Sequence, residues 1–487
     1  MIRTYVLCSR NQIWSTVYNA ETCKKLSMNS IIKTDQRDDR SPERSIQAPS
    51  PILKERIRRY YTQKGLHMEA QFTTLGAIIG LVIAIVLIIR KVQPAYSLIL
   101  GALVGGLIGG GGLTTTVNTM VSGAGSMMSS ILRILTSGIL AGALIKTGSA
   151  EKIAETIVEK LGEKRAVAAI AIATMIICAV GVFIDISVIT VAPIALAIGK
   201  RANLSKSGIL IAMIGGGKAG NIISPNPNTI AVSEAFSQDL TAVMMRNFIP
   251  ALFALVMAIV LASMLCKKSG DAISASDMES AGEKDLPGFG PAVLGPVVVI
   301  IMLALRPIAG IAIDPLIALP VGGFVSMLAT GKIRNCIEYM EFGLSKVIGV
   351  SILLIGTGTI AGIIKASALQ YDVTNVLEAM NMPAFILAPL AGILMAAATA
   401  STTAGATVAA QTFAPTLIAN GVSGLAAAAM VHAGATVLDS LPHGSFFHAT
   451  GGAVSLSIGD RMKLIPYEAA IGLTSTIVSV VLYMVLH

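Results

Sequence analysis

The chain has 487 residues, of which 54% are hydrophobic and only 13% are charged, and its mean hydropathy is +0.76. Soluble domains carry about 25% charged residues, so this composition excludes an ordinary soluble protein and predicts a membrane protein. The five cysteines show no CxxC spacing, which indicates neither a disulfide framework nor a metal site.

Positive charge is concentrated at the start of the chain. Residues 1–67 hold 13 Lys/Arg against 6 Asp/Glu, whereas 68–487 hold 23 against 21. Met68 opens directly onto an apolar run. We therefore expect 1–67 to be either a disordered basic extension or a stretch that precedes the true start. A basic extension of this kind is suited to contact with lipid or with nucleic acid. For the protein as a whole, we expect membrane lipid as a partner and no nucleic acid.

Ten apolar stretches are suitable as single membrane spans, each of which needs about 20 residues. Two further stretches, 166–199 and 383–419, are too long for one crossing and too short for two. Their centres are polar or small, so each predicts a re-entrant hairpin of two half-length helices. The single spans are 72–89, 94–111, 126–146, 207–232, 247–266, 291–307, 311–330, 346–365, 423–449 and 466–486.

The two halves of the sequence resemble each other. Gly138-x-x-x-Gly142 is matched by Gly358-x-x-x-Gly362, and two further motifs match in the same order, all at offsets of 217 to 222. This predicts an all-α polytopic membrane protein with two repeats, 68–266 and 291–487, joined by a cytoplasmic linker at 267–290. Each repeat has five spans and one hairpin, so the second half enters the membrane inverted.

The distribution of basic residues predicts the orientation. One side of the predicted topology collects eighteen Lys/Arg, and the other has only Arg246, Arg306 and Lys365. By the positive-inside rule the first side is cytoplasmic, which leaves Met68 and His487 outside. We expect the protein to lie in the inner membrane of a bacterium, in contact with lipid.

Two predicted spans contain prolines that a continuous helix does not tolerate. The first contains Ser224-Pro225-Asn226-Pro227-Asn228-Thr229 and the second Asp439-Ser440-Leu441-Pro442-His443-Gly444. One such break alone is equally well a simple kink, but paired broken helices at matching repeat positions indicate a transporter binding site. The predicted substrate-binding residues are Lys218, Ser224, Asn226, Asn228, Thr229, Ser401, Thr402, Thr403, Asp439, Ser440 and His443.

Some of these residues have a second interpretation. The hydroxyl run in the second hairpin is suited to a hydroxylated substrate, or simply to close helix packing. Lys218 either meets a substrate carboxylate or pairs with Asp185 or Asp439. A charged side chain at the bilayer centre costs about 2.5–3.5 kcal/mol, so Lys218, Asp185 and Asp439 each need a partner or a function. For Arg133 we favour a structural role, as a partner for a carbonyl, over a functional one.

Proton coupling is predicted at three residues. Asp185 lies at the tip of the first hairpin, where it would face the site. His443 and His448 flank the second break and are suited to proton relay, whereas His432 is more suited to a structural role.

The sequence resembles the gluconate permease family of proton symporters, within the ion-transporter superfamily, over about 68–487. The resemblance is carried by residues 148–166 (GSAEKIAETIVEKLGEKRA), 182–198 (VFIDISVITVAPIALAI), 224–232 (SPNPNTIAV) and 456–463 (LSIGDRMK). It implies a proton-coupled importer of gluconate or a related small organic anion, with a mobile domain on a homodimeric scaffold. Asp185 matches the acidic residue at the family's first hairpin tip.

The sequence departs from that family at both breaks. Gluconate carriers tend to have His where this chain has Asn226, and a different sequence where it has Asp439-Ser-Leu-Pro-His-Gly444. A shorter hydroxy acid or an amino acid is therefore an alternative substrate, and sodium an alternative coupling ion. A passive channel is a rival that the sequence, without a filter-like repeat, does not favour. No phosphate loop, HExxH or nucleophile elbow is present, so we expect neither an enzyme nor a cofactor.

Overall fold

The computed structural model describes residues 70–268, 271–274, 285–369, 371–373, 375, 383–442 and 444–486. These residues lie in the unit Thr62–His487, and their secondary structure is helical, with two isolated β-bridges and no strand. The predicted extension at 1–67 lies outside the described residues, as does part of the predicted linker at 267–290.

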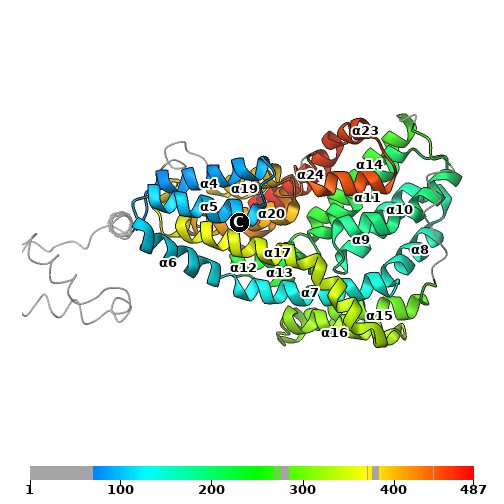
Figure 1. Ribbon diagram of the computed structural model, residues 1–487. Coiled ribbons are helices and arrows are strands. Elements are labelled where there is room, and N and C mark those ends of the chain that lie inside the picture. Colours follow the sequence, from blue (N-terminus) through cyan, green and yellow to red (C-terminus); the bar gives the residue numbers. More distant parts are fainter. Residues whose placement is uncertain are drawn as a thin grey trace, which may run out of the picture. The chain divides into compact units, whose positions relative to one another are not determined.

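The first half of the described chain runs from α4 to α14 (Figure 1). Its helices are α4 (Thr74–Ile89), α5 (Pro94–Ile108), α6 (Gly112–Gly125), α7 (Met128–Lys146), α8 (Ser149–Leu161), η1 (Glu163–Arg165), α9 (Ala166–Ala179), α10 (Ile184–Arg201), α11 (Lys206–Asn221), α12 (Pro227–Ala235), α13 (Leu240–Arg246) and α14 (Phe248–Lys268).

The second half runs from α15 to α24. Its helices are α15 (Phe289–Ala309), α16 (Pro315–Ala329), η3 (Ile333–Asn335), α17 (Cys336–Lys365), η4 (Ala384–Ile386), α19 (Leu387–Thr399), α20 (Thr402–Ala419), α21 (Gly424–Gly434), α22 (Ser445–Ala453), α23 (Ile458–Met462) and α24 (Ile465–Leu486). In both halves a helix hairpin is followed by a broken helix and then by a long terminal helix.

Both predicted hairpins are present as pairs of helices. The first is α9–α10, whose turn contains Gly181 at φ +112°, a conformation that favours glycine. The second is α19–α20, whose turn is Ala400, at φ 47°, followed by the N-cap Ser401. The helices α9 and α19 have 14 and 13 residues, fewer than the roughly 20 that one crossing requires.

Both predicted breaks are also present. The first lies between α11 and α12, where Asn226 caps the helix that begins at Pro227. The second separates α21, which ends at Gly434, from α22, which begins at Ser445. Proline at the first position of a helix is favourable because its missing N–H would have no intrahelical partner. Pro227 therefore marks where a new half-helix begins rather than a bend in a continuous one, and Pro442 lies in the non-helical segment before α22.

Hydropathy alone missed two helices of more than ten residues, and the short helices α13 and α23, and it shortened α17. The helix α6 was not predicted because its Thr, Ser and Asn residues lower the local hydropathy. The helix α8 was missed because it is amphipathic, with a charged face that includes Lys152 and Glu155. The helix α17 begins at Cys336, well before the predicted start at 346.

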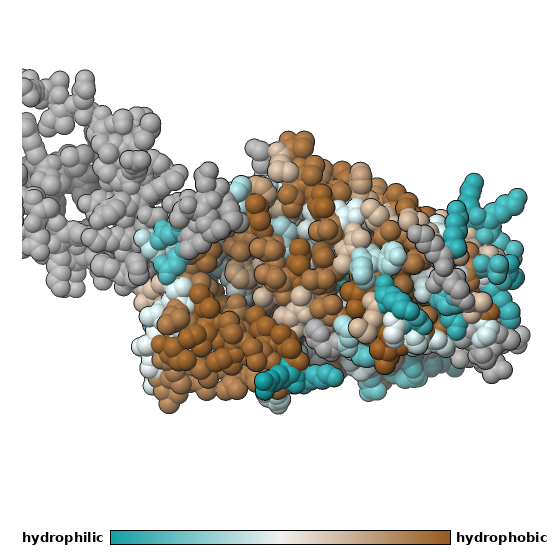
Figure 2. Space-filling view, turned by 90° about the horizontal axis from the view of Figure 1, so that it is seen from above, coloured by the Kyte–Doolittle hydropathy of each residue, from teal (hydrophilic) through white to brown (hydrophobic). Residues whose placement is uncertain are grey.

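Four described helical segments are long and apolar enough to cross a membrane: Met128–Lys146, Phe248–Lys267, Ile333–Lys365 and Ile458–Leu486. Further apolar helices, such as α4 and α5, have 10–17 residues. Large apolar side chains are exposed on several of them, and Figure 2 shows a broad hydrophobic surface with hydrophilic residues gathered towards one end. The chain is therefore a helical membrane protein.

Glycines let α17 pack directly against α6 and α7, along which it lies in Figure 1. A Cβ on Gly142 would lie 2.2 Å from the carbonyl oxygen of Tyr339, and one on Gly123 would lie 2.2 Å from that of Gly358. The glycine motifs that the sequence repeats are thus the places where helix backbones touch, which explains why larger residues are absent there.

Candidate functional site

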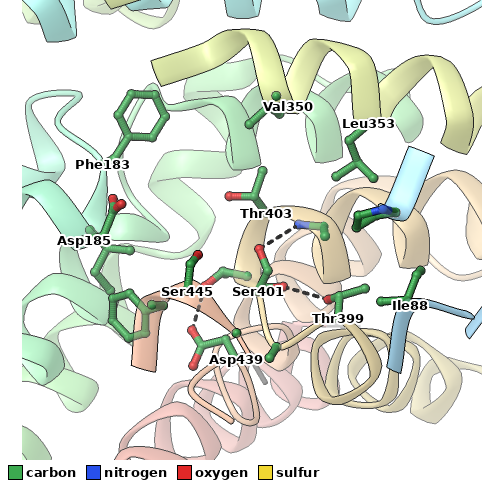
Figure 3. Close-up of a pocket in the computed structure, with 18 of the residues that line it drawn as sticks. Ile88, Phe183, Asp185, Val350, Leu353, Thr399, Ser401, Thr403, Asp439 and Ser445 are labelled. Atoms are coloured by element: carbon green, nitrogen blue, oxygen red, sulfur yellow. Dashed lines mark hydrogen bonds between the residues drawn. The ribbon is translucent and has the colours of Figure 1, made fainter. Parts of the chain in front are cut away.

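A cavity of about 670 Å³ lies where the two hairpin tips meet the second break. The tip of α9–α10 contributes Asp185, the tip of α19–α20 contributes Ser401 and Thr403, and the second break contributes Asp439 (Figure 3). The helix α17 covers the cavity with Val350 and Leu353, as the close-up shows. We call this space the first cavity. Its other polar lining residues are Lys91, Gln93, Lys346, Thr399, Thr402, Ser445 and His448.

The first break is held by a network of amide side chains. Asn226 Oδ1 accepts hydrogen bonds from the backbone N–H groups of Asn228 and Thr229, at 3.0 and 3.1 Å. Asn226 Nδ2 donates to Asn221 Oδ1 at 2.6 Å, and Asn228 Nδ2 donates to the same oxygen at 3.0 Å. These neutral groups are buried, so the network satisfies the start of α12 and ties it to the end of α11 without any charge.

The second break is held by a buried ion pair. Lys218 Nζ lies 2.6 Å from Asp439 Oδ1, and the two residues are only 1% and 2% exposed. The ammonium group also donates to the carbonyl oxygen of Thr436 in the break, at 2.5 Å. Of the partners predicted for Lys218, the structure therefore gives it Asp439. Ser440 Oγ donates to the same Asp439 oxygen at 2.9 Å.

The tip of the second hairpin connects the two breaks. Thr403 Oγ1 donates to Asn228 Oδ1 at 2.5 Å, and Thr402 Oγ1 donates to Asp439 Oδ2 at 2.6 Å. Consecutive residues of α20 thus contact a break from each half of the chain. A displacement of this tip changes the surroundings of both breaks at once.

Three helices begin at the first cavity. Ile184 opens α10, Thr402 opens α20 and Ser445 opens α22, and all three residues line the space. The first N–H groups of a helix have no intrahelical partner, and the helix dipole places partial positive charge there. Such helix starts are suited to anions. Among the described residues, no side chain caps the start of α22, so its N–H groups are available to a ligand.

The carboxyl group of Asp185 faces the first cavity (Figure 3). Among the described residues, no side chain donates a hydrogen bond to it. Lys346 lines the same cavity and is close enough to interact electrostatically with Asp185. His448 also lines the cavity, and its Nε2 lies 2.8 Å from the carbonyl oxygen of Pro442. His443 lies outside the described residues.

The predicted site residues fall into two groups. The first lines the cavity and consists of Asp185, Ser401, Thr402, Thr403, Asp439 and His448. The second lies outside that lining and is buried in the polar wall that holds the breaks: Lys218, Ser224, Asn226, Asn228, Thr229 and Ser440.

A second buried ion pair was not anticipated. Arg461 is one of the eighteen basic residues that were predicted to lie on the cytoplasmic side. It is 1% exposed and forms a two-point salt bridge with Glu468, also buried. Its guanidinium lies 4.7 Å from the ring centroid of Phe447 and donates to Thr450 Oγ1 at 3.2 Å. Arg461 therefore anchors α22, whose start lines the cavity, to α24. The only signal in the sequence was its position in the 456–463 motif.

Arg133 has partners other than the carbonyl that we expected. Its guanidinium makes two hydrogen bonds to the carboxylate of Asp314, at 2.9 and 2.6 Å, and one to Glu234 at 2.7 Å. The predicted partner was wrong because carboxylates from α12 and from the start of α16, distant in sequence, converge on α7. This cluster joins the far end of α12 to two other helices.

A helical membrane protein with paired hairpins and paired broken helices around a polar cavity has the architecture of a secondary transporter. Residues 72–486 match the model of the GntP family of permeases, and the chain belongs to this family.

Its relatives are transporters. It is 53% identical over 411 residues to an uncharacterized transporter of Haemophilus influenzae, covering 84% of this chain and 98% of that one. It is 22% identical to the high-affinity gluconate transporter of Escherichia coli, covering 71% of this chain and 84% of that protein. It is also 22% identical to the D-serine transporter DsdX of E. coli, covering 69% and 81%.

The fold resembles a solved structure. The YdaH transporter of Alcanivorax borkumensis, described as having an unusual topology, superposes with a TM-score of 0.57 over 75% of this chain and 87% of that one. At 15% identity this likeness concerns the fold.

Proposed function

We propose that the protein imports gluconate or a related small hydroxycarboxylate together with a proton, across the inner membrane of a bacterium. The observation that carries this proposal is the composition of the first cavity. It combines three helix starts, two lysines (Lys91 and Lys346) and a run of hydroxyl groups at 399–403. Helix starts and lysines attract a carboxylate, and the hydroxyl groups are suited to hydrogen bonds with substrate hydroxyls.

The pairing of Lys218 with Asp439 supports an anion over a zwitterion. Because these two charges neutralise each other, the remaining formal charges of the cavity are Lys91 and Lys346 against Asp185. An amino-acid ammonium group would find Asp439 already engaged by Lys218, Thr402 and Ser440. A D-serine transporter is nevertheless among the relatives, so an amino acid is the second candidate.

Asp185 is the proposed proton carrier. Its carboxyl group faces the cavity, and its hydrogen-bond partners are the backbone N–H groups of Asp185 and Ile186 rather than side chains, so no described side chain has to move when it binds or releases a proton. His448 lies in the same lining and is the proposed relay, as is His443. The alternative is coupling to sodium at the carbonyl groups beside Asn228 and Thr229.

The proposed transport cycle depends on the internal repeat in the chain. We propose that the two halves are inverted repeats of five spans and a re-entrant hairpin each, that the hairpin tips move relative to α17, and that the transporter is a homodimer. The matching order of hairpin, break and terminal helix in the two halves supports the repeat. The close glycine packing of α6, α7 and α17 supports a rigid frame.

The test is uptake of labelled gluconate into proteoliposomes under an inward proton gradient, with unlabelled acids and D-serine as competitors. We expect accumulation that an uncoupler abolishes. Asp185→Asn should abolish proton-driven uptake and spare exchange of preloaded substrate. Uphill uptake that Asp185→Asn leaves unchanged would remove Asp185 from the mechanism. Uptake driven by sodium after the proton gradient is collapsed would favour the sodium-coupled alternative.

A further inference from the structure

The helix α6 carries a polar stripe that the first cavity does not use. Its side chains recur at the spacing of one helix face, and several are exposed although α6 packs against α5 and α17 in a membrane protein. Within the described residues, no hydrogen bond engages the side chains of Asn118 or Ser122. Polar groups facing lipid are costly, so such a stripe indicates contact with water or a ligand. The stripe consists of Thr115, Asn118, Thr119, Ser122 and Ser126.

The stripe forms one wall of a second cavity of about 700 Å³. Lys365 at the end of α17 and Gln411 of α20 line it from the other walls. Like the first cavity, it combines a lysine with several hydroxyl groups. None of the residues discussed above as the candidate site lines it.

The two cavities follow one another along the same pair of helices. On α17, the lining of the first cavity runs from Lys346 to Leu353, and that of the second from Ala361 to Lys365. The eight residues from Leu353 to Ala361 correspond to a rise of about 12 Å, so the cavities are separated along the helix axis. On α20, Thr403 lines the first cavity and Gln411 the second.

Between the cavities the same face of α20 carries another polar group. Thr403, Thr407 and Gln411 are each four residues apart and therefore lie on one face of the helix. Thr407 is fully buried, and its Oγ1 has no hydrogen-bond partner among the described residues. An unpartnered buried hydroxyl group is costly, so its place midway between two polar cavities calls for a functional explanation.

We propose that the second cavity is a binding vestibule on the opposite side of the membrane from the first, and that it takes the same class of ligand, a small hydroxycarboxylate. Lys365 attracts the carboxylate, and the α6 stripe and Gln411 hydrogen-bond the substrate hydroxyls. Thr407 offers the substrate a hydrogen-bonding group on α20 between the first and second cavities. This inference rests on the proposed function and adds a substrate-binding site on the other side of the membrane.

The experiment measures the accessibility of single cysteines in proteoliposomes with a membrane-impermeant thiol reagent, in a background whose native cysteines are replaced by serine. Ser122→Cys reports on the second cavity and Ser445→Cys on the first. Val121→Cys is the matched control, because Val121 is exposed on α6 but does not line the cavity. Thr115→Cys is a second reporter on the stripe if Ser122→Cys does not fold.

We expect Ser122→Cys and Ser445→Cys to react from opposite sides of the membrane, gluconate to slow both reactions several-fold, and Val121→Cys to be unreactive. Reaction of both reporters from one side, or a Ser122→Cys no more reactive than Val121→Cys, would overturn the inference. Protection of Ser445→Cys alone would overturn it while leaving the proposed function intact. Protection of neither, together with no gluconate uptake, would overturn both.

Discussion

The two breaks occupy matching places in the two halves of the chain but are stabilised by different chemistry. At the first, Asn221 Oδ1 accepts hydrogen bonds from the side chains of Asn226 and Asn228, a few residues away in sequence, and every group is neutral. At the second, Asp439 depends on Lys218, which lies 221 positions away. The first break is thus held mainly by residues close in sequence, whereas the second depends on an ion pair between the two halves of the chain.

The sharpest test of this comparison removes the long-range charge. Lys218→Ala leaves the buried Asp439 carboxylate uncompensated, and breaking a buried pair in this way costs about 3–5 kcal/mol. We expect a correspondingly large loss in the free energy of unfolding, measured by denaturant titration in detergent. The double variant Lys218→Met with Asp439→Asn should recover most of it. A single variant as stable as the wild type would show that the second break does not depend on the pair.

Substitutions at the first break should lower the free energy of unfolding less than Lys218→Ala does. Asn226→Ala removes the side chain that caps α12, and losing such a cap costs about 0.5–2 kcal/mol. Asn226→Asp keeps an oxygen for the cap but loses the donor to Asn221, so it should fall between the wild type and Asn226→Ala in the same titration. A loss from Asn226→Ala as large as that from Lys218→Ala would contradict the distinction between the breaks.

A smaller effect is expected where the second hairpin contacts the first break. Thr403→Val removes the hydrogen bond to Asn228, which contributes about 0.5–1.5 kcal/mol. Because Thr403 lines the cavity, we expect the change mainly as a raised KM for uptake. Thr476→Val is the control, since that hydroxyl donates to the carbonyl oxygen of Gly472 within α24 and Thr476 lines neither cavity. Equal KM values for the two variants would argue against a special role for Thr403.

The smallest effect is expected at an exposed ion pair. Lys146 and Glu338 lie 3.1 Å apart, with side chains 35% and 61% exposed. Solvent screens such a pair, so Lys146→Gln should change the free energy of unfolding by less than about 1 kcal/mol, and less still at high salt. A loss that approaches that of Lys218→Ala would mean that burial does not separate the two pairs.

Much of the fold could be predicted because its signals are local. Every predicted span coincides with a helix or a pair of helices, and Pro227 and the polar centres at 183–187 and 399–407 indicated the breaks and hairpins. These signals rest on hydropathy and backbone chemistry, which neighbouring residues decide. The helices α6 and α8 were not predicted because the mean hydropathy of polar and amphipathic helices is low.

The side-chain partners could be predicted only in part. Asp185, Thr402, Thr403 and Asp439 were identified from their place at hairpin tips and breaks, and all line the first cavity. Arg461 was counted as a loop charge because nothing in its neighbourhood indicates that Phe447, Thr450 and Glu468 enclose it. Which charge meets which depends on contacts between distant segments, and one sequence does not contain that information.

The long separation of Lys218 and Asp439 also has a consequence for biosynthesis. At about 5–20 residues per second, the ribosome needs roughly 10–45 s to make the 221 residues between them. During that interval α11 carries a lysine that has no partner yet and that costs about 2.5–3.5 kcal/mol at a bilayer centre. The nascent first half must therefore wait beside the insertion machinery, or hold α11 near the interface, until the second half arrives. Membrane insertion of α11 is thus completed by a residue that has not been translated when the helix leaves the ribosome.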